Sequence, residues 1–417
     1  MSSFCGQLNE YKNIAIDRFD GKNLQCSAFF LSHCHSDHMV GLKSIPFLKH
    51  LQSSKDVYLY CSKVTKILLL ADEECRPLEK YMQILEIGLA NLVKVPSTNH
   101  SEEYYVNVTL IPAGHCPGSV MFLFEGKDGT ALYTGDFCWE VGQASKVLAF
   151  QSEKSLKKID SVYVDTTFCI AEAYNIPSRS ECVDLTIPIV SDWLSLSSSH
   201  VVVIICPAKY GYEYLFKKLA QQLDTKVHVP DWKVDIYDQI PDLAGYFTSD
   251  PLLSRIHACK FYTQKLSRST LPCSPTAHDS KQYQVLNIKP STMWFTAQKK
   301  SSTSQEHVAV TAVNPKGLNR ICYTMHSSYR EIRDLISFLQ PKSVLPSVLP
   351  FSDECWDIVQ ERLKSFLSFP NKERNKFIQT VTTNNVLGTL RKIKSSTLKP
   401  NQHHSDDFDD LFNNDEL

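Results

Sequence analysis

Short apolar runs separated by turn residues dominate the first 168 residues of the chain. Several are rich in β-branched and aromatic residues and end at Gly, Pro, Asp or His, which is typical of β-strands. These predicted strands span residues 26–31, 57–60, 106–111, 120–124, 131–133 and 161–164. Helical spacing of apolar residues occurs at 64–70 and 181–196. The pattern therefore predicts a strand-rich unit with few helices.

The pattern changes after residue 178. A buried-strand run at 201–205 precedes a helical run at 212–223, and such alternation predicts an α/β unit with a parallel sheet. Polar segments at 263–280 and 297–306 predict loops. Beyond residue 321 we expect a strand, a helix at 329–339, a strand at 343–349 and a helix at 356–367. The chain is polar from residue 370 onward and acidic at 405–417, which predicts a disordered tail.

Composition adds few constraints. The formal net charge is −1, so global charge gives no support to nucleic-acid binding, although a local groove can still be basic. The polar N-terminal segment predicts no signal peptide, and no apolar stretch approaches the length of a membrane span. We therefore expect the 14 cysteines to be thiols, with some of them available to bind metal.

A dense metal-ligand motif follows the first predicted strand. Residues 31–38 read Leu-Ser-His-Cys-His-Ser-Asp-His. The alternation of an extended chain puts His33 and His35 on one side. Asp37 and His38 follow where a helix can start, turned toward a neighbouring point. Two imidazoles can hold one metal ion, and an Asp–His pair can help to hold a second ion nearby.

Two further ligand candidates stand in turns. His115 lies in Gly-His-Cys-Pro-Gly at 114–118, and Asp136 follows a predicted strand, where a carboxylate can bridge two metal ions. Histidine and carboxylate ligands suit Zn²⁺, with Mn²⁺, Mg²⁺ or iron as alternatives. Asp17 ends a strand-like run before the cluster. It is either a hydrogen-bond acceptor for a ligand imidazole or an exposed turn residue.

Together these motifs resemble the β-CASP branch of the metallo-β-lactamase superfamily over residues 3–368, and within it the DNA cross-link repair family. The resemblance implies an αββα sandwich with an inserted α/β domain. The implied division is a first metallo-β-lactamase part at 1–155, a β-CASP domain at 156–320, a return segment at 321–368 and a polar tail at 369–417.

The resemblance also implies a role for each matching residue. Asp17 matches the first family motif, and Asp165 and His326 match the acidic and histidine motifs of the β-CASP region, in which the aspartate orients a histidine that acts as general acid. Asp17, Asp37, Asp165 and His326 are thus the implied catalytic residues. The implied ligands of the catalytic metals are His33, His35, Asp37, His38, His115 and Asp136.

Val348, within Pro-Ser-Val-Leu-Pro at 346–350, bears on the substrate. RNA-processing relatives typically place a histidine there as a metal ligand, whereas DNA-acting members have valine. The resemblance therefore favours DNA and a weak second metal site, filled by Zn²⁺, Mg²⁺ or Mn²⁺. Ser36 departs from the family, since a lysine can occur there. The short segment after the catalytic region makes control by a kinase partner less secure than the catalytic assignment.

A second cluster is less clear from spacing. His257 and Cys259 stand two residues apart, Cys273 follows 14 residues later and His228 precedes His257 by 29. Spacing alone favours ordinary buried residues. The resemblance to end-processing members of the family implies instead a structural His₂Cys₂ zinc site at these four positions. His278 is the nearest competing histidine.

The implied function is a nuclear DNA endonuclease that cuts hairpins and overhangs, with 5′-exonuclease capacity, in double-strand-break repair by non-homologous end joining. Its implied partners are DNA, a DNA-dependent protein kinase and end-joining factors, with no membrane. Alternatives are a cross-link or telomere-type 5′-exonuclease, a small-molecule thioesterase or lactamase, and a catalytically silent DNA-end scaffold. Asp165 and His326 argue against the small-molecule enzymes, and the complete ligand set argues against the scaffold.

Overall fold

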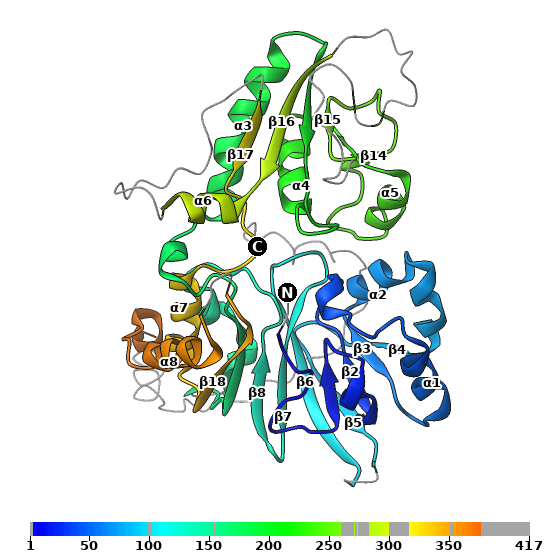
Figure 1. Ribbon diagram of the computed structural model, residues 1–417, viewed down its shortest axis with the longest axis vertical. Coiled ribbons are helices and arrows are strands. Elements are labelled where there is room, and N and C mark those ends of the chain that lie inside the picture. The colour runs from blue at the N-terminus through cyan, green and yellow to red at the C-terminus, as the bar shows by residue number, and fades with distance from the viewer. Residues whose placement is uncertain are drawn as a thin grey trace, which may run out of the picture.

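The computed structural model describes residues 3–98, 102–152, 155–259, 271, 273, 283–299, 317–350 and 354–376. Two units stack along the long axis (Figure 1). The lower unit contains both ends of the described chain, and the upper unit is formed by the middle of the chain. Within the described residues, no helix is long and apolar enough to cross a membrane.

Two sheets face each other in the lower unit. The first is parallel throughout and has the order β1-β2-β3-β4, with bounds β1 (Ile14–Ile16), β2 (Ala28–Phe30), β3 (Leu59–Cys61) and β4 (Met82–Ile84). The second has the order β18-β11-β8-β7-β6-β5, with bounds β5 (Ala90–Val95), β6 (Tyr104–Pro112), β7 (Val120–Gly126), β8 (Gly129–Tyr133), β11 (Ser161–Asp165) and β18 (Ser343–Val348). A short hairpin joins β9 (Gln151–Ser152) to β10 (Ser155–Leu156).

Alternating side chains make the sandwich. Ile14, Ile16 and Phe30 of the first sheet pack with Phe122 and Tyr133 of the second in one buried cluster. The outer faces are covered by helices, with α1 (Ile45–Ser53) and α2 (Lys63–Leu70) on the first sheet and α7 (Tyr329–Leu339) and α8 (Trp356–Phe366) on the second (Figure 1). This is the expected αββα sandwich.

The upper unit is a parallel α/β layer structure. Its sheet has the order β14-β13-β15-β12-β16-β17, with bounds β12 (His200–Ile204), β13 (Val227–His228), β14 (Phe247–Thr248), β15 (Ile256–His257), β16 (Gln284–Pro290) and β17 (Leu318–Ile321). Its helices are α3 (Arg179–Ser195), α4 (Glu213–Gln222), α5 (Asp231–Tyr237) and α6 (Thr292–Lys299).

One buried cluster crosses between the two units. Cys34 and Leu68 of the lower unit belong to the same apolar core as Tyr210, Leu215 and Val227 of the upper unit. Burial of this shared apolar surface stabilises a fixed contact between the units. The site described below lies at that contact.

One sequence expectation needs correction. The polar segment at 297–306 predicts a loop, but α6 extends through Lys299, because Trp294 and Phe295 in this helix pack against the apolar segment at 168–176. Residues 300–306 lie outside the described residues, as do nearly all of 263–280, His278 and the tail beyond residue 376.

The strand pairing also bears on the expected domain limits. β11 follows the expected boundary at 156, yet it pairs with β8 and β18 in the lower unit, so the chain leaves that sheet only after Asp165. β17 pairs with β16 in the upper sheet, and the chain returns after Ile321. The chain therefore passes from the lower sheet to the upper unit after Asp165, and the division of the chain at 156 and 320 stays a prediction.

Candidate metal centre

The centre begins at the carboxyl ends of the first sheet. β1 ends one residue before Asp17, and β2 ends three residues before His33. Carboxyl ends of parallel strands meet at one edge of a sheet, where ligand sites commonly form. His33 and His35 follow β2 in an extended segment, and a single 3₁₀ turn, Ser36–His38, then redirects the chain.

The second sheet brings the other ligands to the same edge. His115 lies in the turn between β6 and β7, and Asp136 follows β8. Gly135 has a φ of 53°, and a Cβ there would lie 2.8 Å from the Ser32 hydroxyl. Glycine therefore lets the chain before Asp136 approach the chain before His33 closely.

Four imidazoles surround the Asp136 carboxylate. His33 Nε2 and His115 Nε2 lie 3.7 Å and 3.6 Å from Asp136 Oδ2, and His38 Nε2 lies 3.2 Å from Oδ1. His35 Nδ1 faces His115 Nε2 at 2.8 Å. Potential ligand atoms of His33, His35, His115 and Asp136 all lie within 4.8 Å of one another. Oδ2 of Asp136 thus lies toward His33 and His115, and Oδ1 lies toward His38. This is the arrangement expected of a carboxylate that bridges two metal ions.

Asp17 holds His38 from behind. Its Oδ2 accepts hydrogen bonds from His38 Nδ1 at 2.9 Å and from the Tyr133 hydroxyl at 3.0 Å, and both of its oxygens accept from Ser32. Because Nδ1 carries the proton, Nε2 of His38 is the nitrogen left for a metal. Asp17 is buried behind the histidines, so it is a positioning residue.

Backbone carbonyls orient two other histidines. His35 Nε2 donates to the carbonyl of Tyr210 at 3.1 Å, and His115 Nδ1 donates to the carbonyl of Met325 at 2.7 Å. Both carbonyls come from segments that follow strands of the upper unit. Each bond leaves the opposite ring nitrogen facing the centre. The upper unit therefore helps to fix the tautomers of residues that belong to the lower unit.

Burial and charge adjust the protonation of these groups. Burial, together with neighbouring imidazoles, holds the pKa of His33 and of His115 well below the ordinary histidine value, so both rings are neutral. Burial opposes protonation of His38, but Asp136 and Asp17 outweigh it and raise its pKa. Burial would also raise the pKa of Asp136, yet His38 and other imidazoles hold it well below the usual range. His33, His115 and Asp136 are therefore in the forms that bind metal, whereas His38 has to release a proton to act as a ligand.

Unpartnered buried atoms fit a metal ion. Within the described residues, His33 Nε2, His38 Nε2 and Asp136 Oδ1 are buried and lack a hydrogen-bond partner. His38 Nε2 and Asp136 Oδ1 are close, but their geometry is not that of a hydrogen bond. Buried polar atoms without partners are unfavourable, and a cation among them would satisfy all three. The donor set of nitrogens and carboxylate oxygens suits Zn²⁺.

Asp165 and His326 form a second element of the centre. His326 Nδ1 donates to Asp165 Oδ2 at 2.8 Å, while Asp165 Oδ1 accepts from the Thr167 backbone and hydroxyl. Burial opposes protonation of His326, but the Asp165 carboxylate outweighs it and raises the pKa of the imidazole. Nδ1 is thus engaged, and Nε2 is the nitrogen available for proton transfer.

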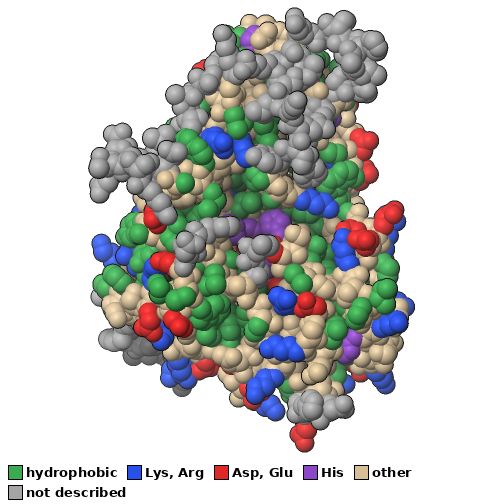
Figure 2. Space-filling view, viewed as in Figure 1, with side chains coloured by type: hydrophobic (Ala, Val, Ile, Leu, Met, Phe, Trp, Pro, Cys, Tyr) green, Lys and Arg blue, Asp and Glu red, His purple; other side chains and the backbone are tan. Residues whose placement is uncertain are grey.

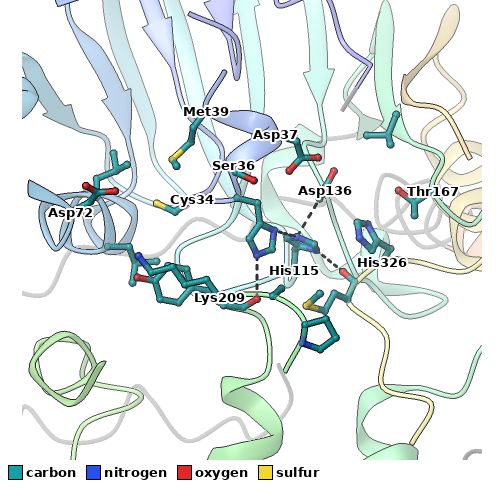
Figure 3. A pocket seen from close by; sticks show the side chains of 18 of the residues that line it. Cys34, Ser36, Asp37, Met39, Asp72, His115, Asp136, Thr167, Lys209 and His326 are labelled. Carbon is teal, nitrogen blue, oxygen red and sulfur yellow. Dashed lines mark hydrogen bonds and ion pairs between the residues drawn. The ribbon is translucent and has the colours of Figure 1, made fainter. Parts of the chain in front are cut away.

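A cavity of about 530 Å³ opens onto these groups. Asp37, His115, Asp136 and His326 face it from several elements, and Lys209 lies at its far side (Figure 3). Figure 2 shows the histidines in a hollow between the two units. The Asp37 carboxylate is partly exposed and lies 3.9 Å from His38 Nε2. Ser36 and Val348 also line the cavity.

Arg179 supports the centre, a role that the sequence patterns did not predict. Its guanidinium donates to the carbonyls of Gly114, His115 and Thr324, so one side chain of α3 ties the His115 turn to the segment before His326. The role of Tyr210 was not predicted either, because Tyr210 acts through its backbone carbonyl and not through its side chain. No local motif marks such residues, because their partners are distant along the chain.

A separate cluster lies in the upper unit. His228 Nδ1 and His257 Nδ1 are 3.1 Å apart, Cys273 Sγ is 3.5 Å from His257 Nδ1, and His228 Nε2 donates to the Ser249 carbonyl. Together with Cys259 they form a group that could hold a metal. A hydrogen bond from Cys259 lowers the pKa of Cys273 to about 3, with further help from His228 and His257 against the effect of burial. A thiolate beside two imidazoles is a suitable zinc environment.

Comparisons with known proteins agree with this geometry. The model of the DNA repair metallo-β-lactamase family matches residues 241–352. The chain is 42% identical to chicken protein artemis over 371 residues, covering 88% of this chain and 51% of that protein. The chain is thus similar to Artemis proteins over most of its own length. It is also 40% identical to human protein artemis over 410 residues, covering 98% of this chain and 56% of that protein.

Sequence identity is lower to a relative described as an exonuclease. The chain is 30% identical to rat 5′ exonuclease Apollo over 342 residues, covering 82% of this chain and 54% of that protein. It spans about half the length of the curated relatives that it matches. A solved protein of unknown function from Enterococcus faecalis V583 superposes with a TM-score of 0.49 at 15% identity, covering 77% of this chain and 75% of that one, and we base nothing on it.

Proposed function

We propose that the chain is a metal-dependent nuclease that hydrolyses phosphodiester bonds at DNA ends. It cuts hairpins and overhangs as an endonuclease and also removes nucleotides as a 5′-exonuclease. The observation that carries the proposal is that a histidine–carboxylate metal centre and the Asp165–His326 pair converge on one open cavity. Phosphoryl transfer to water needs these two elements, a cationic centre and a proton donor for the leaving oxygen.

The proposed ligands follow from the donor atoms. His33, His35, His115 and Asp136 would hold one ion, and Asp37, His38 and the other oxygen of Asp136 would hold a second. A bound ion supplies Lewis-acid polarisation and lowers the pKa of a water toward neutrality. We propose Zn²⁺ for the first position, on the basis of its nitrogen-rich donor set. Mg²⁺ or Mn²⁺ suits the second, more oxygen-rich position.

The chain itself handles the leaving group. His326 Nε2 donates a proton to the departing 3′-oxygen, and Asp165 keeps the imidazole oriented through Nδ1. General acid catalysis of this kind typically contributes about 10²–10⁴-fold. Water adds to phosphorus as the P–O3′ bond breaks. The products are a 5′-phosphate and a 3′-hydroxyl.

DNA is favoured over RNA by Val348. Its side chain lines the cavity and offers no metal-binding atom, where RNA-processing relatives of the resembled family have histidine. Similarity to Artemis over most of the chain supports a place in double-strand-break repair by non-homologous end joining. A nuclear location, a DNA-dependent protein kinase and end-joining factors as partners belong to the same proposal.

A second candidate rests on the similarity to Apollo, whose name describes a 5′ exonuclease. The two activities differ in their products. An endonuclease opens a hairpin with blocked ends and releases oligonucleotides, whereas a 5′-exonuclease needs a free 5′ end and releases nucleotides from it.

The test is cleavage of labelled DNA by the purified chain. Single-stranded, overhang and hairpin DNA, with matched RNA, are incubated with Zn²⁺, Mg²⁺ or Mn²⁺. We expect cutting of hairpins and overhangs, with no cutting of RNA. His35→Ala and Asp37→Ala should abolish cleavage and leave DNA binding nearly intact, because affinity comes mainly from phosphate contacts elsewhere.

The matched control is His50→Ala. His50 lies on α1, where it is hydrogen bonded to the carbonyl of Cys26, and it does not line the cavity. It should cleave like the wild type. Normal turnover in His35→Ala would reject the metal assignment. A wild-type chain that binds DNA ends and cuts none of them with any of these ions would support the scaffold alternative.

A further inference from the structure

A second cavity of about 500 Å³ lies beside the metal centre, between α2 and α5. α5 of the upper unit stands above α2 of the lower unit at the right of Figure 1. On α2, the lining residues are Lys63, Lys66, Ile67 and Leu70. Their spacing of three and four places them on one face of the helix. An entire helix face therefore forms one wall.

The opposite wall is built in the same way. Trp232, Asp235 and Ile236 of α5 have the same helical spacing and line the cavity, together with Gln239 just after the helix. Trp232 is 36% exposed, and the ammonium groups of Lys209 and Lys233 lie 4.9 Å and 5.7 Å from its ring centroid. Large aromatic side chains usually bury their surface, and one left open on a cavity wall is a candidate stacking platform.

The charge of the cavity is positive. Lys63, Lys66 and Arg76 line it, against the single carboxylate of Asp235. Among the described residues neither lysine has an ion-pair partner, and Arg76 is 3.5 Å from Glu73 in an exposed pair. Exposed pairs of this kind are weak. The protein is near neutral as a whole, so this local excess of cations marks a surface suited to binding a polyanion.

The two cavities share a wall. Lys209 lines the metal cavity, and its Nζ lies 4.9 Å from the ring centroid of Trp232. α2 likewise contributes to both, because Leu68 and Leu69 line the metal cavity while Lys66 and Ile67 line the second one. Lys209 therefore stands between a residue of the metal cavity and the Trp232 wall of the second cavity.

We propose that this second cavity binds the unpaired DNA strand next to the bond that is cut. A base stacks on Trp232, and neighbouring phosphates contact Lys63, Lys66 and Arg76. The proposal rests on the proposed nuclease function, since it takes the substrate from there. It adds a subsite with a defined preference for strands that are not base-paired.

The preference for an unpaired strand follows from stacking. In a duplex both faces of each base are covered by neighbouring bases, whereas an unpaired base can leave the stack and place its face on an aromatic side chain. Basic grooves with aromatic platforms are the usual form of single-strand binding sites. Here the apolar Ile67, Leu70 and Ile236 line the cavity along with the cations and the indole.

The test measures binding separately from cleavage. A fluorescent oligothymidylate and a blunt duplex, both with uncleavable phosphorothioate linkages, are titrated with the full chain and followed by anisotropy. Trp232→Ala should weaken binding of the single strand about tenfold, within the range known for stacked bases. Trp232→Phe, which keeps an aromatic face, should restore most of the affinity. Blunt-duplex binding should change less than about twofold in both variants, because paired bases cannot stack on the indole.

Charge is tested with a matched pair of double variants. Lys63→Ala with Lys66→Ala should reduce the slope of log affinity against log salt by about 1, because two phosphate contacts are lost from a single strand. Lys364→Ala with Lys376→Ala removes two cations paired with glutamates on the opposite side of the lower unit and should leave the slope unchanged.

Failure of the subsite and failure of the nuclease proposal have different signatures. Hydrolysis of bis(p-nitrophenyl) phosphate reports the metal centre alone and should be the same in Trp232→Ala and wild type. If Trp232→Ala and the lysine pair bind the oligonucleotide as wild type does, the subsite is rejected, whatever the hydrolysis. If no DNA is cut by wild type yet these variants lose single-strand binding, the subsite stands and the nuclease proposal falls.

Discussion

Asp17 has a φ of 55°, a left-handed conformation that residues with a side chain seldom adopt. Such a conformation costs on the order of 1 kcal/mol or more and persists where surrounding contacts determine it. Here the contacts are hydrogen bonds from Ser32, His38 and Tyr133 to its carboxylate. The strain is thus located where a ligand histidine has to be held.

Asp17→Asn should weaken metal binding about 10- to 100-fold, the usual effect of losing a group that orients a ligand. The amide has one acceptor oxygen in place of two, and its NH₂ group faces donors. Metal affinity is measured by competition with a chelator, and DNA cleavage follows it. Tyr133→Phe removes one donor and leaves His38 bonded, so it is the control. Unchanged affinity in Asp17→Asn would contradict the positioning role.

Val348→His should increase occupancy of the second metal position. Val348 ends β18, is 4% exposed and lines the cavity with Asp37 and Asp136. An imidazole there adds a ligand near the two carboxylates. Native mass spectrometry counts the ions per chain, and Val348→Leu controls for size. Equal metal content in the histidine and leucine variants would reject this expectation, which concerns occupancy and makes no claim that activity rises.

Single residues also show what sequence can and cannot predict about the site. Histidines two residues apart after a strand, and acidic residues in turns, form patterns that can be read locally. The structure brings His33, His38, His115 and Asp136 together as those patterns suggested. Arg179 and Tyr210 act through hydrogen bonds to or from backbone carbonyls of distant segments. Such contacts depend on the assembled fold and have no signature in the sequence.

At the scale of elements, α7 begins at Tyr329, three residues after His326. Ser328 and Glu331 form a capping box at its first turn: the Ser328 hydroxyl accepts a hydrogen bond from the Glu331 backbone, and the Glu331 carboxylate accepts one from the Ser328 backbone. Burial raises the pKa of Glu331 to about 7, against the effect of the hydrogen bonds from Ser328. The element that positions His326 therefore contains a carboxyl group that ionises near neutral pH.

Glu331→Gln should become more stable relative to wild type as pH rises from 5 to 8. The folded pKa is above the ordinary value, so the contribution of this group to stability is present below about pH 4.5 and is lost as pH passes through about 7. The change in relative stability is on the order of 1–3 kcal/mol. Thermal melts at each pH measure it, with Glu181→Gln in the exposed capping box of α3 as the matched control. A constant difference between Glu331→Gln and wild type would contradict the expectation.

Elements with strong periodicity were predictable, and short ones were not. The helix expected at 181–196 is α3, Arg179–Ser195, and the strand expected at 106–111 is β6, Tyr104–Pro112. β13 and β15 have two residues each, too few to show alternation, although they carry His228 and His257. Tertiary pairing in the upper sheet creates these strands, so their sequence alone carries little signal.

At the scale of the whole molecule, the cluster in the upper unit joins two neighbouring strands to residues farther along the chain. His228 and His257 are on neighbouring strands, and Cys259 and Cys273 lie on either side of a segment outside the described residues. We predict that these four residues bind a structural zinc. Four protein ligands leave no position for water, so such a site stabilises and does not catalyse.

Cys259→Ser should lose one zinc per chain and lower the melting temperature by roughly 5 °C or more, because structural zinc binding is coupled to folding. Cleavage should fall only through this loss of stability. Zinc stoichiometry and a thermal melt measure the effect, with the exposed Cys5→Ser as control. Equal zinc content and melting temperature in Cys259→Ser and wild type would show that the site does not exist.

The carbonyls of Tyr210 and Met325, bonded to His35 and His115, have a consequence for how the molecule responds to its ligands. Because these bonds join ligand histidines of the lower unit to the upper unit, metal affinity and the stability of the contact between the units are coupled in one thermodynamic cycle, and each strengthens the other by the same factor. Chelation should then speed hydrogen exchange at 207–212 and 324–328, and a DNA end that spans both units should slow the release of metal. The substrate would in this way help to retain the ion that cuts it.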